Sequence, residues 1–138
     1  MYAKGRVRRT KKTTAVKAVP TEADEQKLLF EWAEYAEVLH PELQLLYHVP
    51  NEGRRSYRAG YELRKQGMRA GVPDLCLPVS NGEYHALYIE MKRKDGGKVS
   101  EAQRWWIDKL NDSGNLAVIC HGFDEARSII LGYLQNAK

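Results

Sequence analysis

An apolar run at residues 86–89 leads directly into two charged residues, Glu90 and Lys92. The hairpin signal Asn81-Gly82 precedes this run, so the sequence predicts a strand over Tyr84 to Lys92. Residues two apart on a strand share one face, which places the carboxylate of Glu90 beside the ammonium of Lys92. Functional sites tolerate such a pair at the end of a buried strand more often than cores do. We therefore expect a functional site on this strand.

The rest of the chain alternates between helical and strand patterns. Helical spacing and capping signals predict helices that begin after Thr21, at Tyr57, after Ser100 and after Asp124. Short apolar runs between turn signals predict strands at Leu43 to Val49, Asp74 to Val79, Tyr84 to Lys92 and Asn115 to His121. The order α-β-α-β-β-α-β-α indicates an α/β fold, in which helices flank a mixed central sheet of about four strands.

The length of 138 residues, 43% of them apolar, favours a single domain over residues 21–138. Residues 1–20 hold seven Lys or Arg and no acid, and we expect them to form a disordered basic tail. Nonspecific attraction to DNA and disorder without function are both compatible with this composition. No membrane-spanning run or signal peptide is recognisable, so we expect a cytoplasmic protein with no membrane partner.

Basic residues gather between positions 54 and 69, where Glu62 is the single acid and two Tyr are interleaved. The basic residues are Arg54, Arg55, Arg58, Arg64, Lys65 and Arg69. Such a segment can grip the phosphates of a nucleic acid, but charge runs are usually solvated helix faces. Both interpretations remain open at this point.

Asp74 follows the chain-breaking Gly71-Val72-Pro73 and precedes Glu90 by sixteen residues. Mg²⁺ prefers carboxylate, carbonyl and water oxygens, and Asp74 and Glu90 supply two carboxylates. The main-chain carbonyl of Met91 can turn toward the same ion, while Lys92 can hold an attacking water or stabilise developing negative charge. These residues predict a metal-dependent site that hydrolyses phosphodiesters.

The connection between the two strands raises a geometric difficulty. A two-residue turn at Asn81-Gly82 would pair Asp74 with Ile89 and send the Asp74 and Glu90 side chains to opposite faces. A bulge or a connection with an odd number of residues would restore a common face.

An ordered series of motifs resembles the VRR-NUC family, the virus-type replication-repair branch of the PD-(D/E)xK nucleases. The motifs are Pro50-Asn51-Glu52-Gly53-Arg54, Gly71-Val72-Pro73-Asp74-Leu75, Glu90-Met91-Lys92, and Ser100-Glu101-Ala102-Gln103 with Trp106 and Gly114. The similarity extends from about Glu25 to Leu134 and implies a restriction-endonuclease-like fold.

The resemblance implies Mg²⁺ or Mn²⁺ bound by Asp74, Glu90 and the Met91 carbonyl, with Lys92 catalytic. By position it adds two further catalytic residues, Glu25 and Gln103, and Glu25 could reach the metal directly or through water. Each has a structural alternative, because Glu25 is a favourable acid in the first turn of a helix and Gln103 completes a capping box with Ser100.

The resemblance also implies an endonuclease for branched DNA such as four-way (Holliday) junctions, acting in DNA repair as a homodimer without a small-molecule cofactor. Asn51 and the basic residues of positions 54–69 would contact the nucleic acid. The alternative is a noncatalytic nucleic-acid-binding module in which the acids serve folding alone. RNA as the substrate is not excluded by these residues.

Overall fold

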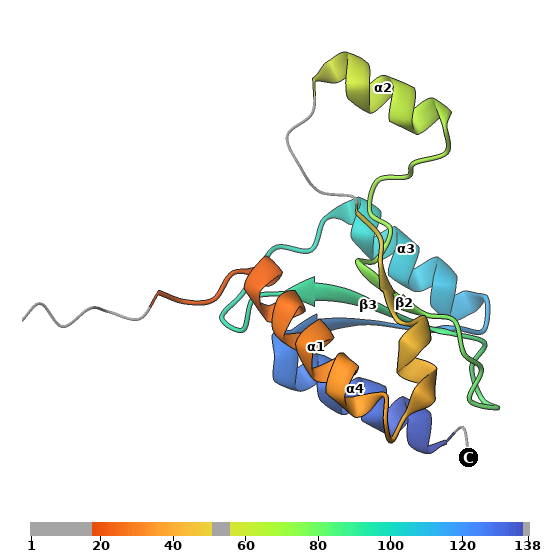
Figure 1. Ribbon diagram of the computed structural model, residues 1–138. Coiled ribbons are helices and arrows are strands. Elements are labelled where there is room, and N and C mark those ends of the chain that lie inside the picture. Colours follow the sequence, from red (N-terminus) through yellow and green to blue (C-terminus); the bar gives the residue numbers. More distant parts are fainter. Residues whose placement is uncertain (1–17, 51–55, 137–138) are drawn as a thin grey trace, which may run out of the picture.

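The computed structural model describes residues 18–50 and 56–136. Its elements are α1 (Glu22–Ala36), the 3₁₀ helix η1 (Pro41–Leu45), β1 (Tyr47–His48), α2 (Tyr57–Lys65), β2 (Leu75–Leu77), β3 (Leu87–Lys92), α3 (Glu101–Asp112), β4 (Leu116–His121) and α4 (Phe123–Gln135) (Figure 1). The predicted α/β fold and the order α-β-α-β-β-α-β-α are confirmed.

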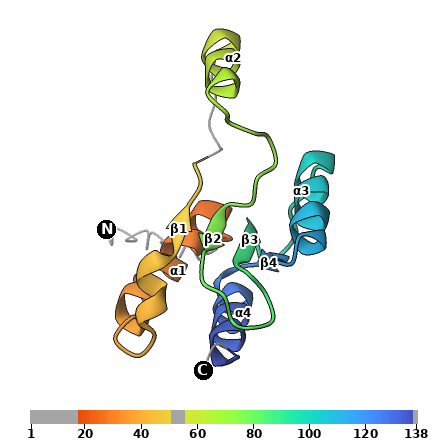
Figure 2. The same cartoon turned by 90° about the vertical axis from the view of Figure 1, so that its right-hand side faces the viewer.

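The four strands form one mixed sheet in the order β1-β2-β3-β4. The β1–β2 and β2–β3 pairs are antiparallel, whereas β3 and β4 are parallel and are connected through α3. Figure 2 shows α3 on one side of the sheet, with α1 and α4 on the other. The sheet therefore presents two different faces to its helices.

Alternation along β3 separates the core from the polar face. Leu87, Ile89 and Met91 are buried in one apolar cluster with residues of α1 and α4. Glu90 and Lys92 alternate with these residues along the strand. Their side chains therefore point to the opposite face of the sheet, which α3 covers. Because side chains alternate along β3, one face of the strand packs in the apolar core and the other face carries the charged residues.

The register of β2 against β3 removes the predicted difficulty. Leu75 pairs with Ile89, and Leu77 pairs with Leu87, so the connection spans residues 78–86, an odd number. Continued by one residue, this register places Asp74 opposite Glu90 on the same face. The predicted two-residue turn is wrong, because the Asn81 side chain instead folds a longer loop by accepting hydrogen bonds from the main-chain N–H groups of residues 83 and 84.

Two other local predictions are also wrong. Residues 41–45 form a 3₁₀ helix with Pro41 at its start, and only Tyr47 and His48 of the strand predicted over 43–49 pair with β2. The last helix is capped by Gly122, at φ 87°, and Asp124 lies inside its first turn. Across residues 18–50 and 56–136, no helix has the length and apolarity needed to cross a membrane.

Helix α2 stands away from the sheet in both views (Figures 1 and 2). The helix predicted over Tyr57 to Gln66 is present, with Ser56 as its N-cap, and none of its described residues is buried. Its position leaves the basic side chains that it carries accessible to solvent.

Candidate active site

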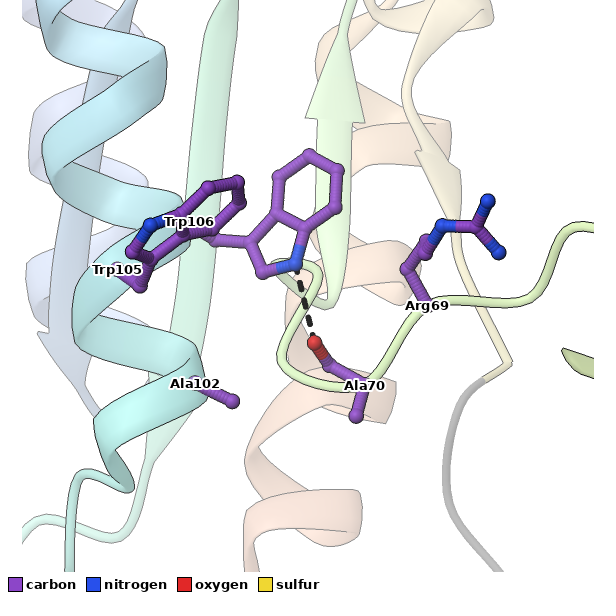
Figure 3. A pocket seen from close by; sticks show the side chains of 5 residues that line it. All are labelled: Arg69, Ala70, Ala102, Trp105 and Trp106. Atoms are coloured by element: carbon purple, nitrogen blue, oxygen red, sulfur yellow. Dashed lines mark hydrogen bonds between the residues drawn. The ribbon is translucent and has the colours of Figure 1, made fainter.

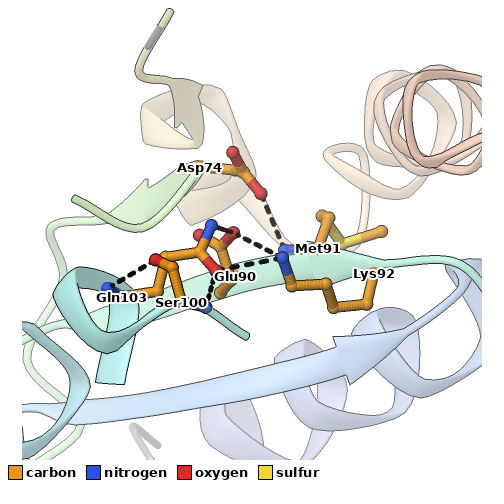
Figure 4. A network of polar contacts seen from close by, with 6 residues as sticks. All are labelled: Asp74, Glu90, Met91, Lys92, Ser100 and Gln103. Atoms are coloured by element: carbon orange, nitrogen blue, oxygen red, sulfur yellow. Dashed lines mark hydrogen bonds and ion pairs between the residues drawn. The ribbon is translucent and has the colours of Figure 1, made fainter. Parts of the chain in front are cut away.

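Three ionisable side chains meet where β2 begins and β3 ends, on the face covered by α3 (Figure 4). Asp74, Glu90 and Lys92 are exposed by only 6%, 1% and 4%. Charged groups are rarely this buried unless they are paired or hold an ion. The cluster predicted from sequence is therefore present as one desolvated group.

Hydrogen bonds on both sides hold Asp74 in place. Its Oδ2 accepts a hydrogen bond of 2.8 Å from the main-chain N–H of Met91. Its carbonyl oxygen accepts from Val49 N at 2.7 Å and lies 3.0 Å from His48 Nδ1. The start of β2 is thus attached to both neighbouring strands, and the Asp74 carboxylate faces β3.

Gln103 reaches from α3 to both charged residues of β3. Its Nε2 donates to Glu90 Oε1 at 2.7 Å, and its Oε1 accepts from Lys92 Nζ at 3.1 Å. The Lys92 ammonium also lies 3.4 Å from Glu90 Oε1. The three side chains therefore form a closed polar network.

The same Gln103 side chain completes the cap of α3. Its Oε1 accepts from the Ser100 N–H at 2.9 Å, while Ser100 Oγ accepts from the Gln103 N–H at 3.1 Å. The predicted capping box is therefore confirmed, whereas the catalytic role predicted for Gln103 stays a prediction. The capping box consequently sets the orientation of the amide that holds Glu90 and Lys92.

Glu90 lacks full compensation for its charge. Its Oε2 is buried without a hydrogen-bond partner among the described residues. Burial, and to a smaller extent the nearby charge of Asp74, together raise the pKa of Glu90 to about 7, against the lowering effect of Lys92. A carboxylate in these surroundings is stabilised by a cation at its open oxygen.

The main chain of Met91 borders the same two carboxylates. Because Ile89 pairs with Leu75, the register continued toward the site places Pro73 opposite Met91. Proline has no N–H and cannot donate a ladder hydrogen bond to the Met91 carbonyl. The motif Pro73-Asp74 therefore ends the ladder where the carboxylates begin.

The donor set is small. Among the described residues, no three or more His, Cys, Asp or Glu side chains form a group that could hold a metal ion. Two carboxylates, a carbonyl and water are nevertheless the set that Mg²⁺ accepts, because this ion keeps several of its waters and needs only one or two carboxylates.

Glu25 is buried, with 1% exposure, but its hydrogen bond lies at a different place. Its Oε2 accepts from the main-chain N–H of Phe123 at 2.7 Å, at the start of α4. An acid is favourable at a helix N-terminus, so this contact has a structural explanation. The metal-binding role predicted for Glu25 stays a prediction.

The residues predicted to contact nucleic acid lie mainly on and after α2. Arg58, Arg64, Lys65 and Arg69 are exposed, whereas Asn51, Arg54 and Arg55 lie outside the described residues. The Arg69 guanidinium donates to the carbonyl oxygens of Arg64 and Met68, and Lys65 Nζ lies 4.5 Å from the ring centroid of Tyr61. Their predicted contacts with nucleic acid stay predictions.

A cavity of about 180 Å³ opens over Asp74 and Glu90. Gly71 forms part of its wall, with φ 87°, and a Cβ atom at Gly71 would lie 2.5 Å from the carbonyl carbon of Ala102 in α3. The sequence shows Gly71 only as a chain breaker, and this close approach to a helix distant in sequence was not predicted.

We expect Gly71→Ala to lower the free energy of unfolding by about 2 to 4 kcal/mol, because it combines backbone strain with a clash against main-chain atoms. Gly82→Ala is the matched control, since Gly82 has φ 88° but open space around its Cβ position, and it should lose only about 1 kcal/mol. Urea denaturation of both variants measures the difference. Equal losses would show that α3 moves freely away from residue 71.

The comparisons with known proteins agree with this geometry. The family model described as VRR-NUC domain matches residues 19–124. A solved structure described as a VRR_NUC domain protein is similar, with a TM-score of 0.75 and 27% sequence identity, over 86% of this chain and 92% of that one. A comparison with curated proteins gave no match.

Proposed function

Because the chain belongs to the VRR-NUC domain family, whose fold is of the nuclease type, we propose that it is a Mg²⁺- or Mn²⁺-dependent endonuclease that hydrolyses DNA phosphodiester bonds. The observation that carries the proposal is the Oε2 atom of Glu90, which has no hydrogen-bond partner within residues 18–50 and 56–136 and is buried on the same face as the carboxylate of Asp74. Two desolvated acids side by side repel each other unless a cation lies between them.

The residues at this site fit a hard divalent cation. Asp74 and Glu90 would bind it through their carboxylates and Met91 through its carbonyl, with water as the remaining ligands. Glu25 is left out of the direct ligands, because its hydrogen bond to Phe123 lies at the start of α4. A contribution of Glu25 through water is compatible with the proposal.

When bound, the cation supplies Lewis-acid stabilisation of the phosphoryl oxygens and lowers the pKa of a bound water. Hydrolysis forms a bond from a water oxygen to phosphorus and breaks the bond from phosphorus to a sugar oxygen. The ammonium group of Lys92 is the positive charge that the protein itself supplies at this site. It orients the attacking water or stabilises the negative charge that develops. Gln103 is a positioning residue, since it fixes both Lys92 and Glu90.

The noncatalytic alternative explains the geometry less well. In a module that only binds nucleic acid, basic residues such as those of α2 would bind phosphates, but two buried acids beside the cavity would not contribute to binding. Folding alone does not account for them either, because the Oε2 atom of Glu90 forms no hydrogen bond within the described parts of the chain.

The proposal extends to branched DNA, such as four-way junctions, and to a homodimer. Two sites related by a two-fold axis would face opposite strands, which suits a junction of the same symmetry. The exposed basic side chains of α2 would then contact phosphates outside the active site. A role in processing intermediates of DNA repair follows from such a substrate.

Incubation with labelled four-way junction, flap, nicked and linear DNA tests the function. We expect cleavage with Mg²⁺ or Mn²⁺, fastest on the junction, and none after the cation is removed by a chelator. A matched RNA panel decides between DNA and RNA. Absence of cleavage of every substrate by the folded protein, or cleavage that persists in chelator, contradicts the proposal.

A further inference from the structure

An aromatic pocket lies next to the cavity that holds the carboxylates. This aromatic pocket has a volume of about 460 Å³ and is lined by Arg69, Ala70, Ala102, Trp105 and Trp106 (Figure 3). Ala70 and Ala102 also line the cavity over Asp74 and Glu90, so the two spaces adjoin. Whatever occupies the aromatic pocket lies beside the proposed cleavage site.

A hydrogen bond to the main chain sets the orientation of Trp106. Its Nε1–H donates to the carbonyl oxygen of Ala70 at 3.0 Å, which connects α3 to the segment before Asp74. Figure 3 shows the indole reaching across from α3 toward this carbonyl. Because the hydrogen-bonding group of Trp106 is already used, its ring offers a ligand only an apolar surface.

Trp105 lies against Trp106 but remains open to solvent. The ring centroids are 5.6 Å apart with an interplanar angle of 86°, an edge-to-face pair. Trp105 is 55% exposed, so packing in the core does not explain its presence. An exposed indole fixed from one side by a second indole is a platform on which a planar ring can stack.

We infer that the aromatic pocket binds an unpaired nucleobase of the substrate strand, stacked against Trp105. This inference rests on the proposed function, because it places the base next to the phosphodiester at Asp74 and Glu90. The volume lies in the range of small-ligand sites, and every nucleobase has the apolar face that stacking needs. Arg69 adds a positive charge at the rim, which suits the phosphates that flank such a base.

The position of the aromatic pocket favours a base over a protein side chain. The aromatic pocket and the carboxylate cavity share Ala70 and Ala102 in their linings, so a strand with its phosphate in one space can place a neighbouring base in the other. The site therefore favours strands with unstacked bases, since taking a base out of a duplex costs a few kcal/mol.

Binding of labelled oligothymidylate and of an equally long abasic strand, measured by fluorescence anisotropy in Ca²⁺, separates stacking from charge. The wild-type chain should bind the strand with bases roughly 5- to 150-fold more tightly than the abasic strand. Trp105→Ala should lower this ratio by about fivefold or more, with unchanged affinity for the abasic strand. Tyr35→Ala is the matched control, because Tyr35 is 83% exposed on α1, and the ratio should persist.

Retention of the wild-type ratio in Trp105→Ala would overturn the inference, as would equal binding of both strands by the wild-type chain. A Trp105→Ala variant that keeps the ratio but loses self-association in sedimentation would instead assign the pocket to a second copy of the chain. This binding assay does not depend on cleavage. If the chain shows the binding ratio here but cuts no DNA in the cleavage assay, only the proposed function is contradicted.

Discussion

The Lys92→Ala variant is expected to cut DNA about 10²- to 10⁴-fold more slowly than the wild-type protein, the range typical for loss of a positioned proton-transferring or charge-stabilising group. The ammonium of Lys92 lies 3.1 Å from Gln103 Oε1 and 3.4 Å from Glu90 Oε1, so it is held in place before substrate arrives. Its burial strengthens its interaction with a developing negative charge. Initial rates on a labelled junction at saturating Mg²⁺ measure the effect.

Lys94→Ala is the matched control. Lys94 lies two residues further along, is exposed, and makes a surface ion pair of 3.5 Å with Asp124. Such pairs contribute little, so the rate should stay within about twofold of wild type. A folded Lys92→Ala protein that cuts at the wild-type rate would remove Lys92 from the mechanism.

The pH dependence of Lys92→Ala separates two roles. Loss of the ammonium also removes a charge that lowers the pKa of Glu90. If the rate of the variant recovers fully as the pH is raised, Lys92 serves only to keep Glu90 ionised. A deficit that persists at high pH, which we expect, assigns Lys92 to the reacting groups.

The second large effect is expected for Glu90→Gln, which should stabilise the metal-free protein while abolishing metal binding and cleavage. Raising the pKa of Glu90 from 4.5 to about 7 costs the ionised form on the order of 3 kcal/mol in the folded state. Glutamine keeps the shape and can keep the contact with Gln103, but it carries no charge to desolvate. It also cannot offer a carboxylate to Mg²⁺.

The sign of the pH dependence follows from the direction of this shift. Because the pKa is higher in the folded than in the unfolded state, Glu90 does not destabilise the folded protein below pH 4.5. The destabilisation grows as the pH rises toward about 7 and is complete above it. The stability difference between Glu90→Gln and wild type should therefore be small at about pH 4 and largest at about pH 8.

Chemical denaturation without divalent cations measures this difference, and calorimetric titration with Mg²⁺ or Mn²⁺ measures binding. Wild-type affinity for the cation should rise with pH up to about 7 and then level off, because binding must displace the proton of Glu90. Glu83→Gln is the control, since Glu83 is exposed in the loop over residues 78–86. A Glu90→Gln protein less stable than wild type at about pH 8 contradicts the argument.

Local sequence patterns predicted correctly those helix ends that depend on contacts between residues close in sequence. The capping box of Ser100 and Gln103 and the N-cap at Thr21 are present because these contacts join residues three apart in sequence. The predictions failed where different local signals compete. Pro41 began a 3₁₀ helix in place of a strand, and Gly122 took the capping position expected for Asp124.

The chemical groups of this protein, and the shared face of Glu90 and Lys92, follow from the order of the residues, because the period of a strand is a local property. The position of Asp74 beside them required the folded chain, since it depends on the odd length of the loop over residues 78–86 and on the pairing of distant strands. Only the packing of α3 decided that Gln103 bridges Glu90 and Lys92. Burial is likewise a property of the assembled fold, and burial is what raises the pKa of Glu90 and leaves its Oε2 unpartnered among the described residues.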